Sequence, residues 1–157
     1  MSEEHQRLNE QRFVEEVGLH FEQAGAPRMA GRIVGWLLIC DPPHQSTGEL
    51  AEALLASKGS ISSATRLLIQ MGMIERISLP GQRRDYFSIK PNSWDEMMKR
   101  RMAVVTDLRV IAERGLQLLE GKDLRVKRRL EEMRSMYAFW ERELPALMER
   151  WEEERKG

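Results

Sequence analysis

The sequence is poor in cysteine and has no long apolar run. Cys40 is the single cysteine, so disulfide-stapled folds are excluded and a reducing compartment fits best. The longest apolar run, Ile33–Cys40, has 8 residues and already contains a glycine, whereas a membrane-spanning helix needs about 20 apolar residues. The acidic start, Met1–His5, lacks the basic and apolar build of a signal peptide. We therefore expect a cytoplasmic protein with no membrane span.

Signatures of catalysis and of metal binding are also absent. The sequence contains no Gly-x-Ser-x-Gly, His-Glu-x-x-His or Walker A pattern, and its histidines, His5, His20 and His44, have no metal-ligand spacing. Neither charge sign is in excess, with 25 basic and 25 acidic residues, so net charge alone points to no partner. The 157 residues suffice for one folded core plus a helical appendage. We expect no enzyme activity, no cofactor and no metal site.

Periodicity and helix-end signals predict a mainly helical protein with one small β-hairpin. Apolar residues recur at helical spacing, and glycine and proline mark helix ends. Ser46–Glu49 has the Ser-x-x-Glu spacing of a capping box, and Ser57 is the expected N-cap of the next helix. The predicted helices cover 4–24, 28–40, 49–55, 57–71, 93–120 and 123 onward, and the predicted strands cover 73–79 and 84–90. Two short helices followed by a hairpin indicate a winged helix-turn-helix, which we assign to residues 26–91. Residues 1–25 and 92–157 are expected to form a helical dimerisation layer, with a kink or break at Pro145.

The second short helix of that unit, residues 57–71, has two contrasting faces. One face is apolar, and at 100° per residue the opposite face is small and polar, with no acid anywhere in the segment. Small side chains let a helix backbone sit deep in the DNA major groove, where Arg can read guanine and Gln can read adenine. The core-facing residues are Ile61, Ala64, Thr65 and Leu68, and the predicted base-reading residues are Ser62, Ser63, Arg66 and Gln70.

The balanced net charge conceals a basic segment. Residues 57–90 contain six Lys or Arg and two acids, whereas residues 1–24 contain two bases and six acids. Leu79–Gln82, with Pro followed by Gly, fits a type II turn that would carry an Arg pair to the DNA backbone or minor groove. An ordinary solvated turn is the alternative interpretation of that pair. The predicted phosphate- and wing-contacting residues are Ser57, Lys58, Ser60, Gln82, Arg83 and Arg84.

Three linked segments resemble the GbsR-like branch of the MarR-type regulators. They are Gly25–Leu38, the pair Glu49–Leu54 and Ala56–Ser62, and Pro80–Phe87, and the likeness extends over residues 13–95. The C-terminal helices are similar in pattern alone. The resemblance implies a bacterial, dimeric winged-helix transcription factor. Some members respond to small molecules such as choline, but no choline-binding motif is matched in this sequence.

The last predicted helix carries a coiled-coil seam. Its apolar residues are spaced alternately four and three apart, and a seam of this length cannot be covered inside one small winged helix. We therefore expect a homodimer that binds a palindromic DNA site. The aromatic residues here could alternatively form a cage for a quaternary amine, although core packing explains their spacing. The predicted dimerisation residues are Val126, Leu130, Met133, Tyr137, Trp140, Leu144, Leu147 and Trp151.

Two functions therefore fit the sequence. The favoured one is a homodimeric, sequence-specific DNA-binding transcriptional regulator, expected to act as a repressor and open to control by an unidentified small-molecule effector. The alternative is a winged helix that serves as a protein-interaction module and docks partners through its C-terminal coiled coil. Salt discriminates between them, because phosphate contacts weaken steeply with salt and apolar docking does not.

Overall fold

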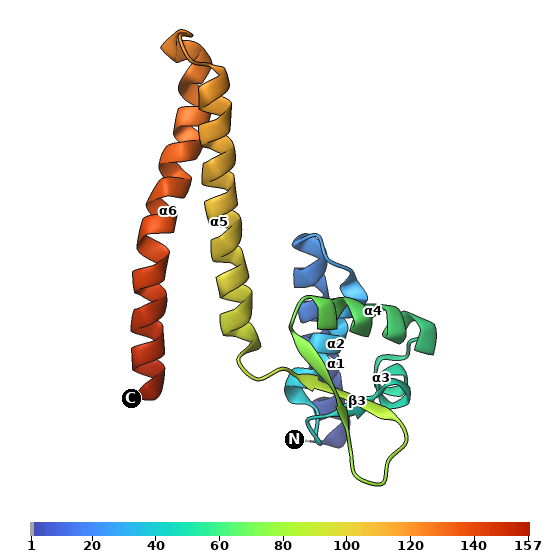
Figure 1. Ribbon diagram of the computed structural model, residues 1–157. Coiled ribbons are helices and arrows are strands. Elements are labelled where there is room, and N and C mark those ends of the chain that lie inside the picture. The colour runs from blue at the N-terminus through green and yellow to red at the C-terminus, as the bar shows by residue number, and fades with distance from the viewer. Residues whose placement is uncertain (1) are drawn as a thin grey trace. The chain divides into compact units, whose positions relative to one another are not determined.

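The computed structural model describes residues 2–157, which form two compact units. The first unit ends at Met97 and the second comprises Met98–Gly157. The elements, in chain order, are α1 (Glu3–Gln23), α2 (Arg28–Ile39), β1 (Gln45–Ser46), α3 (Thr47–Leu54), α4 (Lys58–Gln70), β2 (Ile74–Ser78), β3 (Asp85–Ile89), α5 (Ser93–Leu118) and α6 (Leu124–Lys156) (Figure 1).

Helix α2 lies at the centre of the first unit, as its apolar surface predicts. Ile33 and Val34 are buried among side chains from α3, α4 and the hairpin. Its other side packs against α1 at close range, because a Cβ atom added at Gly31 would lie 2.7 Å from the Val17 carbonyl oxygen and 2.8 Å from Gly18 Cα. Helix α1 thus belongs to the compact unit that holds the helix-turn-helix; a further role for residues 1–25 in a dimer layer stays a prediction.

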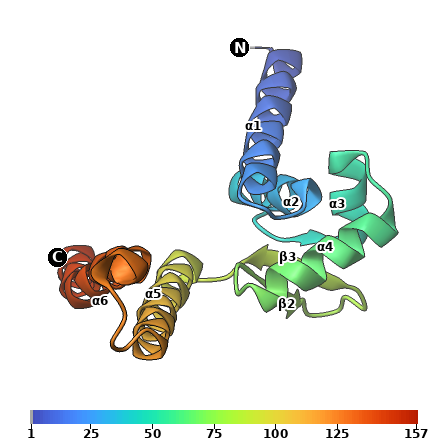
Figure 2. The ribbon, with the colours of Figure 1, turned by 90° about the horizontal axis from the view of Figure 1, so that it is seen from above.

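Helix α3 begins with the capping box that the sequence predicts. The Ser46 hydroxyl accepts from the Glu49 N–H at 3.2 Å, and Glu49 Oε2 accepts from the Ser46 N–H at 3.4 Å. These two bonds satisfy backbone donors that a helix start otherwise leaves unpaired. Figure 2 shows α3 beside α4, with the hairpin next to α4.

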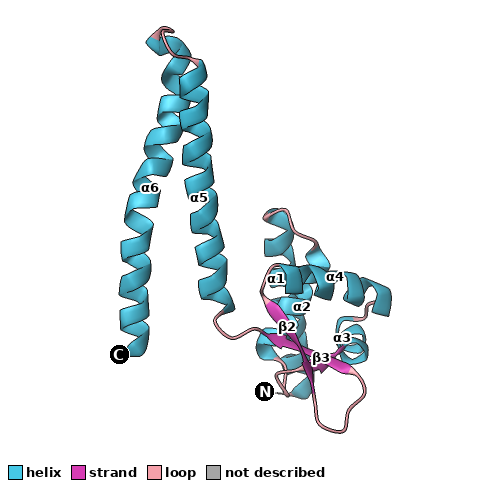
Figure 3. Cartoon of the chain, in the orientation of Figure 1, coloured by secondary structure: helices cyan, strands magenta, loops and turns pink. Residues whose placement is uncertain are grey.

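The sheet has three strands in the order β1-β3-β2, all antiparallel, where the sequence predicted a two-stranded hairpin. The prediction missed β1 because two residues are too short to show a strand period. Gln45 pairs with Phe87 and Ser46 with Tyr86, so the residues that begin α3 are bonded to the wing strand. The loop between β2 and β3 extends beyond the paired strands to form the wing (Figure 3).

The second unit is an antiparallel pair, α5 and α6, joined by a turn at Gly121 (Figure 1). Close to the turn the helices pack tightly, since a Cβ atom added at Gly115 would lie 2.7 Å from Leu130 Cδ1. Farther along, Arg109 of α5 forms ion pairs with Glu141 of α6 and, at 3.0 Å, with Glu113, and these bonds raise the pKa of the Arg109 guanidinium.

Together the two units confirm the predicted fold, a mainly helical winged helix-turn-helix with long C-terminal helices.

Pro145 neither breaks nor ends the last helix, which runs on through it to Lys156. The sequence left open a kink or an interruption at this position. Proline removes one backbone donor and crowds the preceding turn, yet a long helix with an N-cap at Asp123 and continuous flanking turns accommodates it.

Candidate nucleic-acid interface

Helix α4 separates its two faces as predicted. Ser57 caps its start by accepting from the Ser60 N–H at 3.1 Å, and Gly72 follows its end with a φ of 74°. The apolar face is anchored in the core of the first unit, with Ile61 and Leu68 fully buried. The remaining members of that face, Ala64 and Thr65, are also buried. This anchoring fixes which side of α4 is presented outward.

The outward side of α4 holds the predicted base-reading residues. Ser63, Arg66 and Gln70 are exposed, and Ser62 is half-buried at the edge of the helix. No acidic side chain lies on α4. Lys58 and Ser60 occupy its first turn, where free N–H groups and the helix dipole favour phosphate. This face is therefore small, polar and free of acids, and its entry into the major groove and its contacts with bases stay a prediction.

The wing has the predicted turn. The Gln82 N–H donates to the Leu79 carbonyl at 3.1 Å, and Gly81 has a φ of 75°, as position i+2 of a type II turn requires. Gln82 ends the turn, Arg83 and Arg84 follow it, and all three are exposed. Arg84 lies over the Tyr86 ring, 5.7 Å from its centroid, which orients one of the two guanidinium groups.

A groove of about 500 Å³ lies between α4 and the hairpin. Its walls bring together residues from β1 and the start of α3, from α4, from strands β2 and β3, and from the wing. Four cationic side chains and a single carboxylate line it. They are Lys58, Arg66, Arg76, Arg84 and Asp85. The groove thus joins the predicted recognition face to the wing and presents a positive surface of the kind that binds phosphate.

Among the four cationic residues of the groove, Arg76 is the one that was not predicted as a site residue from the sequence. It entered the charge count of residues 57–90, but a lone Arg in a strand gives no sign of which face it occupies. In the structure it is half-exposed, lies 5.8 Å from the Phe87 ring centroid and pairs with Asp85 at 3.5 Å. The cross-strand register, with Arg76 opposite Phe87, is what brings it beside α4. A correct hairpin register read from the sequence would have identified it.

The seam residues of α6 remain partly uncovered in the single chain. Leu130, Met133, Tyr137 and Leu144 are half-buried, and no residue of α6, all of which is described, is fully buried. The exposed members are Val126, Trp140, Leu147 and Trp151. Phe139 and Trp140 meet edge to face with ring centroids 5.5 Å apart. Packing within one chain therefore does not cover the seam.

Cys40 shows no sign of a reactive site. Burial raises the pKa of its thiol, which keeps it protonated and poorly nucleophilic at neutral pH. Among residues 2–157, no three His, Cys, Asp or Glu side chains gather in a way that could hold a metal ion. Within the same residues, none of the helices combines the length and apolar character that crossing a bilayer demands.

A helix with an acid-free outer face, a wing and a cationic groove between them define a protein of the winged helix-turn-helix class. Residues 92–154 match the family model of the MmpR5-like MarR family transcriptional regulators. The HTH-type transcriptional regulator MmpR5 of Mycobacterium tuberculosis (strain ATCC 25618 / H37Rv) is 45% identical over 129 residues, 82% of this chain and 78% of that protein. A crystal structure of a transcriptional regulator is similar with a TM-score of 0.77 and 41% identity, covering 92% of this chain and 99% of the other.

The chain therefore belongs to the MmpR5-like MarR family of transcriptional regulators. Membership confirms the predicted class, a helix-turn-helix DNA-binding regulator and not an enzyme. The family model also matches the C-terminal helices, at residues 92–154, which in the sequence were similar to MarR-type regulators in pattern alone.

Proposed function

We propose that this regulator binds DNA as a homodimer and recognises a palindromic operator. In this proposal α4 enters the major groove and reads bases through Ser62, Ser63, Arg66 and Gln70. The wing and the groove hold the sugar–phosphate backbone. The observation that carries the proposal is the acid-free outward face of α4, which continues directly into the cationic groove.

The dimer rests on uncovered apolar surface in the second unit. Trp140 and Trp151 of α6 are 43% and 48% exposed, and Ile111 of α5 is 53% exposed. Monomers seldom leave large apolar side chains uncovered in continuous rows. A second copy of the same helices would cover them, and it would place two recognition helices on one duplex, about 34 Å apart along its axis. We accordingly assign residues 26–91 to DNA binding, with residues 1–25 and 92–157 contributing to the dimer.

Repression is the proposed mode of action, because a dimer across two half-sites excludes other proteins from the DNA that it covers. A small-molecule effector of unidentified chemistry would act by changing the affinity for the operator. Within the family, the three segments between residues 25 and 87 support a relationship to the GbsR-like branch. The matched family model covers residues 92–154 and includes none of these three segments, so the assignment to the GbsR-like branch stays a prediction.

Selection of DNA from a random pool with the full-length protein tests the proposal. The expected product is an enriched inverted repeat whose half-site centres lie about 10 base pairs apart. Its affinity should fall steeply with salt, as several phosphate contacts require. Absence of any enriched sequence, combined with a flat salt dependence, would instead favour the protein-interaction module.

A further inference from the structure

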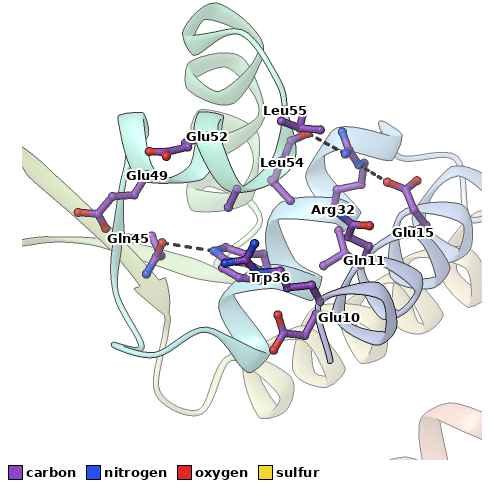
Figure 4. Close-up of a pocket in the computed structure, with 13 residues that line it drawn as sticks. Glu10, Gln11, Glu15, Arg32, Trp36, Gln45, Glu49, Glu52, Leu54 and Leu55 are labelled. Atoms are coloured by element: carbon purple, nitrogen blue, oxygen red, sulfur yellow. Dashed lines mark hydrogen bonds and ion pairs between the residues drawn. The ribbon is translucent and has the colours of Figure 1, made fainter. Parts of the chain in front are cut away.

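A cleft of about 740 Å³ lies among α1, α2 and α3, and one arginine spans it. Arg32 of α2 donates from Nε to Glu15 Oε1 of α1 at 2.7 Å, and from a terminal nitrogen to the Leu54 carbonyl of α3 at 2.8 Å. Figure 4 shows the guanidinium between these two partners, with both bonds drawn. The Arg32 side chain is 21% exposed, so both bonds are shielded from full competition by water.

The carbonyl that Arg32 binds lies at the turn of the helix-turn-helix. Leu54 is the last residue of α3, and Leu55 follows in the left-handed region with a φ of 51°. The Ala56 N–H returns to the Ala51 carbonyl at 3.0 Å, which closes the end of α3 from within. The Leu54 carbonyl, at the negative end of the helix dipole, takes a cationic donor from outside the helix instead. Three residues after Leu54, Ser57 caps the recognition helix.

The path of the Arg32 side chain is built into the packing of α1 on α2. A Cβ atom added at Gly18 of α1 would lie 2.8 Å from Arg32 Cγ and 3.2 Å from the Arg28 carbonyl oxygen. Only glycine at this position of α1 leaves room for the aliphatic stem. The Arg32 stem therefore passes beside Gly18, and the guanidinium beyond it reaches the end of α3.

We propose that Arg32 is a positioning residue for DNA recognition. By joining Glu15 of α1 to the end of α3, it fixes the turn that leads into α4, and thereby the orientation in which α4 presents Arg66. Arg32 itself does not line the cationic groove and touches no surface assigned to DNA. The inference rests on the proposed function, because it assumes that Arg66 reads a base.

Replacement of Arg32 by Met tests this role, since Met retains much of the stem and removes both bonds. We expect affinity for the selected operator to fall about tenfold, with affinity for unrelated DNA and the salt slope unchanged, because no phosphate contact is lost. Arg32→Lys, which keeps the charge and can bond to one partner, should recover part of the loss. Glu15→Gln should likewise lower the affinity for the operator relative to the affinity for unrelated DNA.

Arg28→Met is the matched control. Arg28 also pairs with Glu15, at 3.5 Å, and this ion pair joins α2 to α1 without involving α3. If Arg32 positions the turn, Arg28→Met leaves operator specificity at the parental value. Equal losses in the two variants would mean that stability of the α1–α2 pair alone is at stake, and would overturn the proposal.

A double-mutant cycle with Arg66→Ala gives the decisive measurement. If Arg32 acts through Arg66, Arg32→Met costs little specificity once Arg66 is absent, so the two effects are not additive. Additive effects, or parental specificity in Arg32→Met, overturn the inference. Should Arg32→Met fail to fold, Glu15→Gln takes its place in the cycle. If Arg66→Ala alone leaves base preference unchanged, the proposed base-reading function has failed instead, which separates the two outcomes.

Discussion

At the scale of single residues, what matters is which side chains the first unit leaves free to meet DNA. Burial of Ile61 and Leu68 turns Arg66 outward, and the hairpin register turns Arg76 toward the same groove. The two arginines differ in the charges around them. Arg66 lies on a helix that contains no acidic residue, whereas Arg76 forms an ion pair with Asp85. We therefore expect base reading from the first and a phosphate contact from the second.

Arg66→Ala should lower affinity for the selected operator by about 1–3 kcal/mol and relax the preference at one base position in each half-site. The reason is the loss of the donor pair that we propose to face base edges. Binding titrations against operators substituted at each position give the measurement. A uniform loss across all sequences would move Arg66 to a phosphate contact.

Arg76→Gln should weaken binding to every sequence alike and reduce the salt slope by about one unit, because one phosphate contact is lost. Exposed Arg12 of α1, outside the groove, supplies the control, and Arg12→Gln should leave the slope unchanged. Equal slopes in the parent and Arg76→Gln would show that Asp85 keeps the arginine from DNA.

At the scale of elements, the sequence predicted the helices and the turn whose ends carry local signals. Ser46, Ser57 and Gly81 each act through bonds or dihedral angles set within a few residues, and all three perform the predicted local role. Strand β1 was missed because it exists through pairing with β3, a partner about 40 residues away. The Arg32 bonds were missed for the same reason, since they depend on how three helices pack.

Ser46→Ala should lower the free energy of unfolding by about 1 kcal/mol through loss of the α3 cap. Chemical denaturation should show a lower midpoint with an unchanged slope. Ser2 caps α1 at an exposed end, with its hydroxyl 3.3 Å from the His5 N–H, so Ser2→Ala serves as a control with a smaller expected loss. Equal losses would mean that the buried capping box of α3 stabilises the fold no more than the exposed N-cap of α1 does.

The wing should act on all DNA alike. Replacement of both Arg83 and Arg84 by Ala is expected to weaken specific and non-specific binding together and to lower the salt slope by at most about two units, since exposed arginines beyond a turn contact phosphates more readily than they discriminate bases. Titrations at several salt concentrations give the slope. Parental affinity and slope would place the wing away from the duplex and favour the solvated-turn interpretation.

At the scale of the whole molecule, the heptad spacing of α6 predicted an apolar seam, and packing within a single chain does not cover it. The pattern placed apolar residues in a single row, and the structure leaves that row half-covered, with Leu147 at 55% exposure. Helix α5 adds Val104, Ile111 and Leu118, spaced seven apart and all more than half exposed. Both helices are continuous in the single chain. We expect the rows to serve association instead, and periodicity could predict their presence but not how a partner packs on them.

Trp140→Ala tests that assembly. Trp140 lies in the middle of the seam and is 43% exposed, so part of its cover comes from its own chain and the rest is expected from the second subunit. Truncation of a fully buried Trp costs about 3–5 kcal/mol, and in a dimer whose folding and association are coupled the loss appears as weaker association. Sedimentation at low micromolar concentration should show a raised dimer dissociation constant. Operator binding should weaken in parallel, although no groove residue has changed.

Met136, which is off the seam and 50% exposed, gives the control Met136→Ala, expected to remain dimeric. A Trp140→Ala protein that is as dimeric as the parent and binds the operator equally well would place Trp140 in the packing of its own chain and move the subunit contact to another face of the pair.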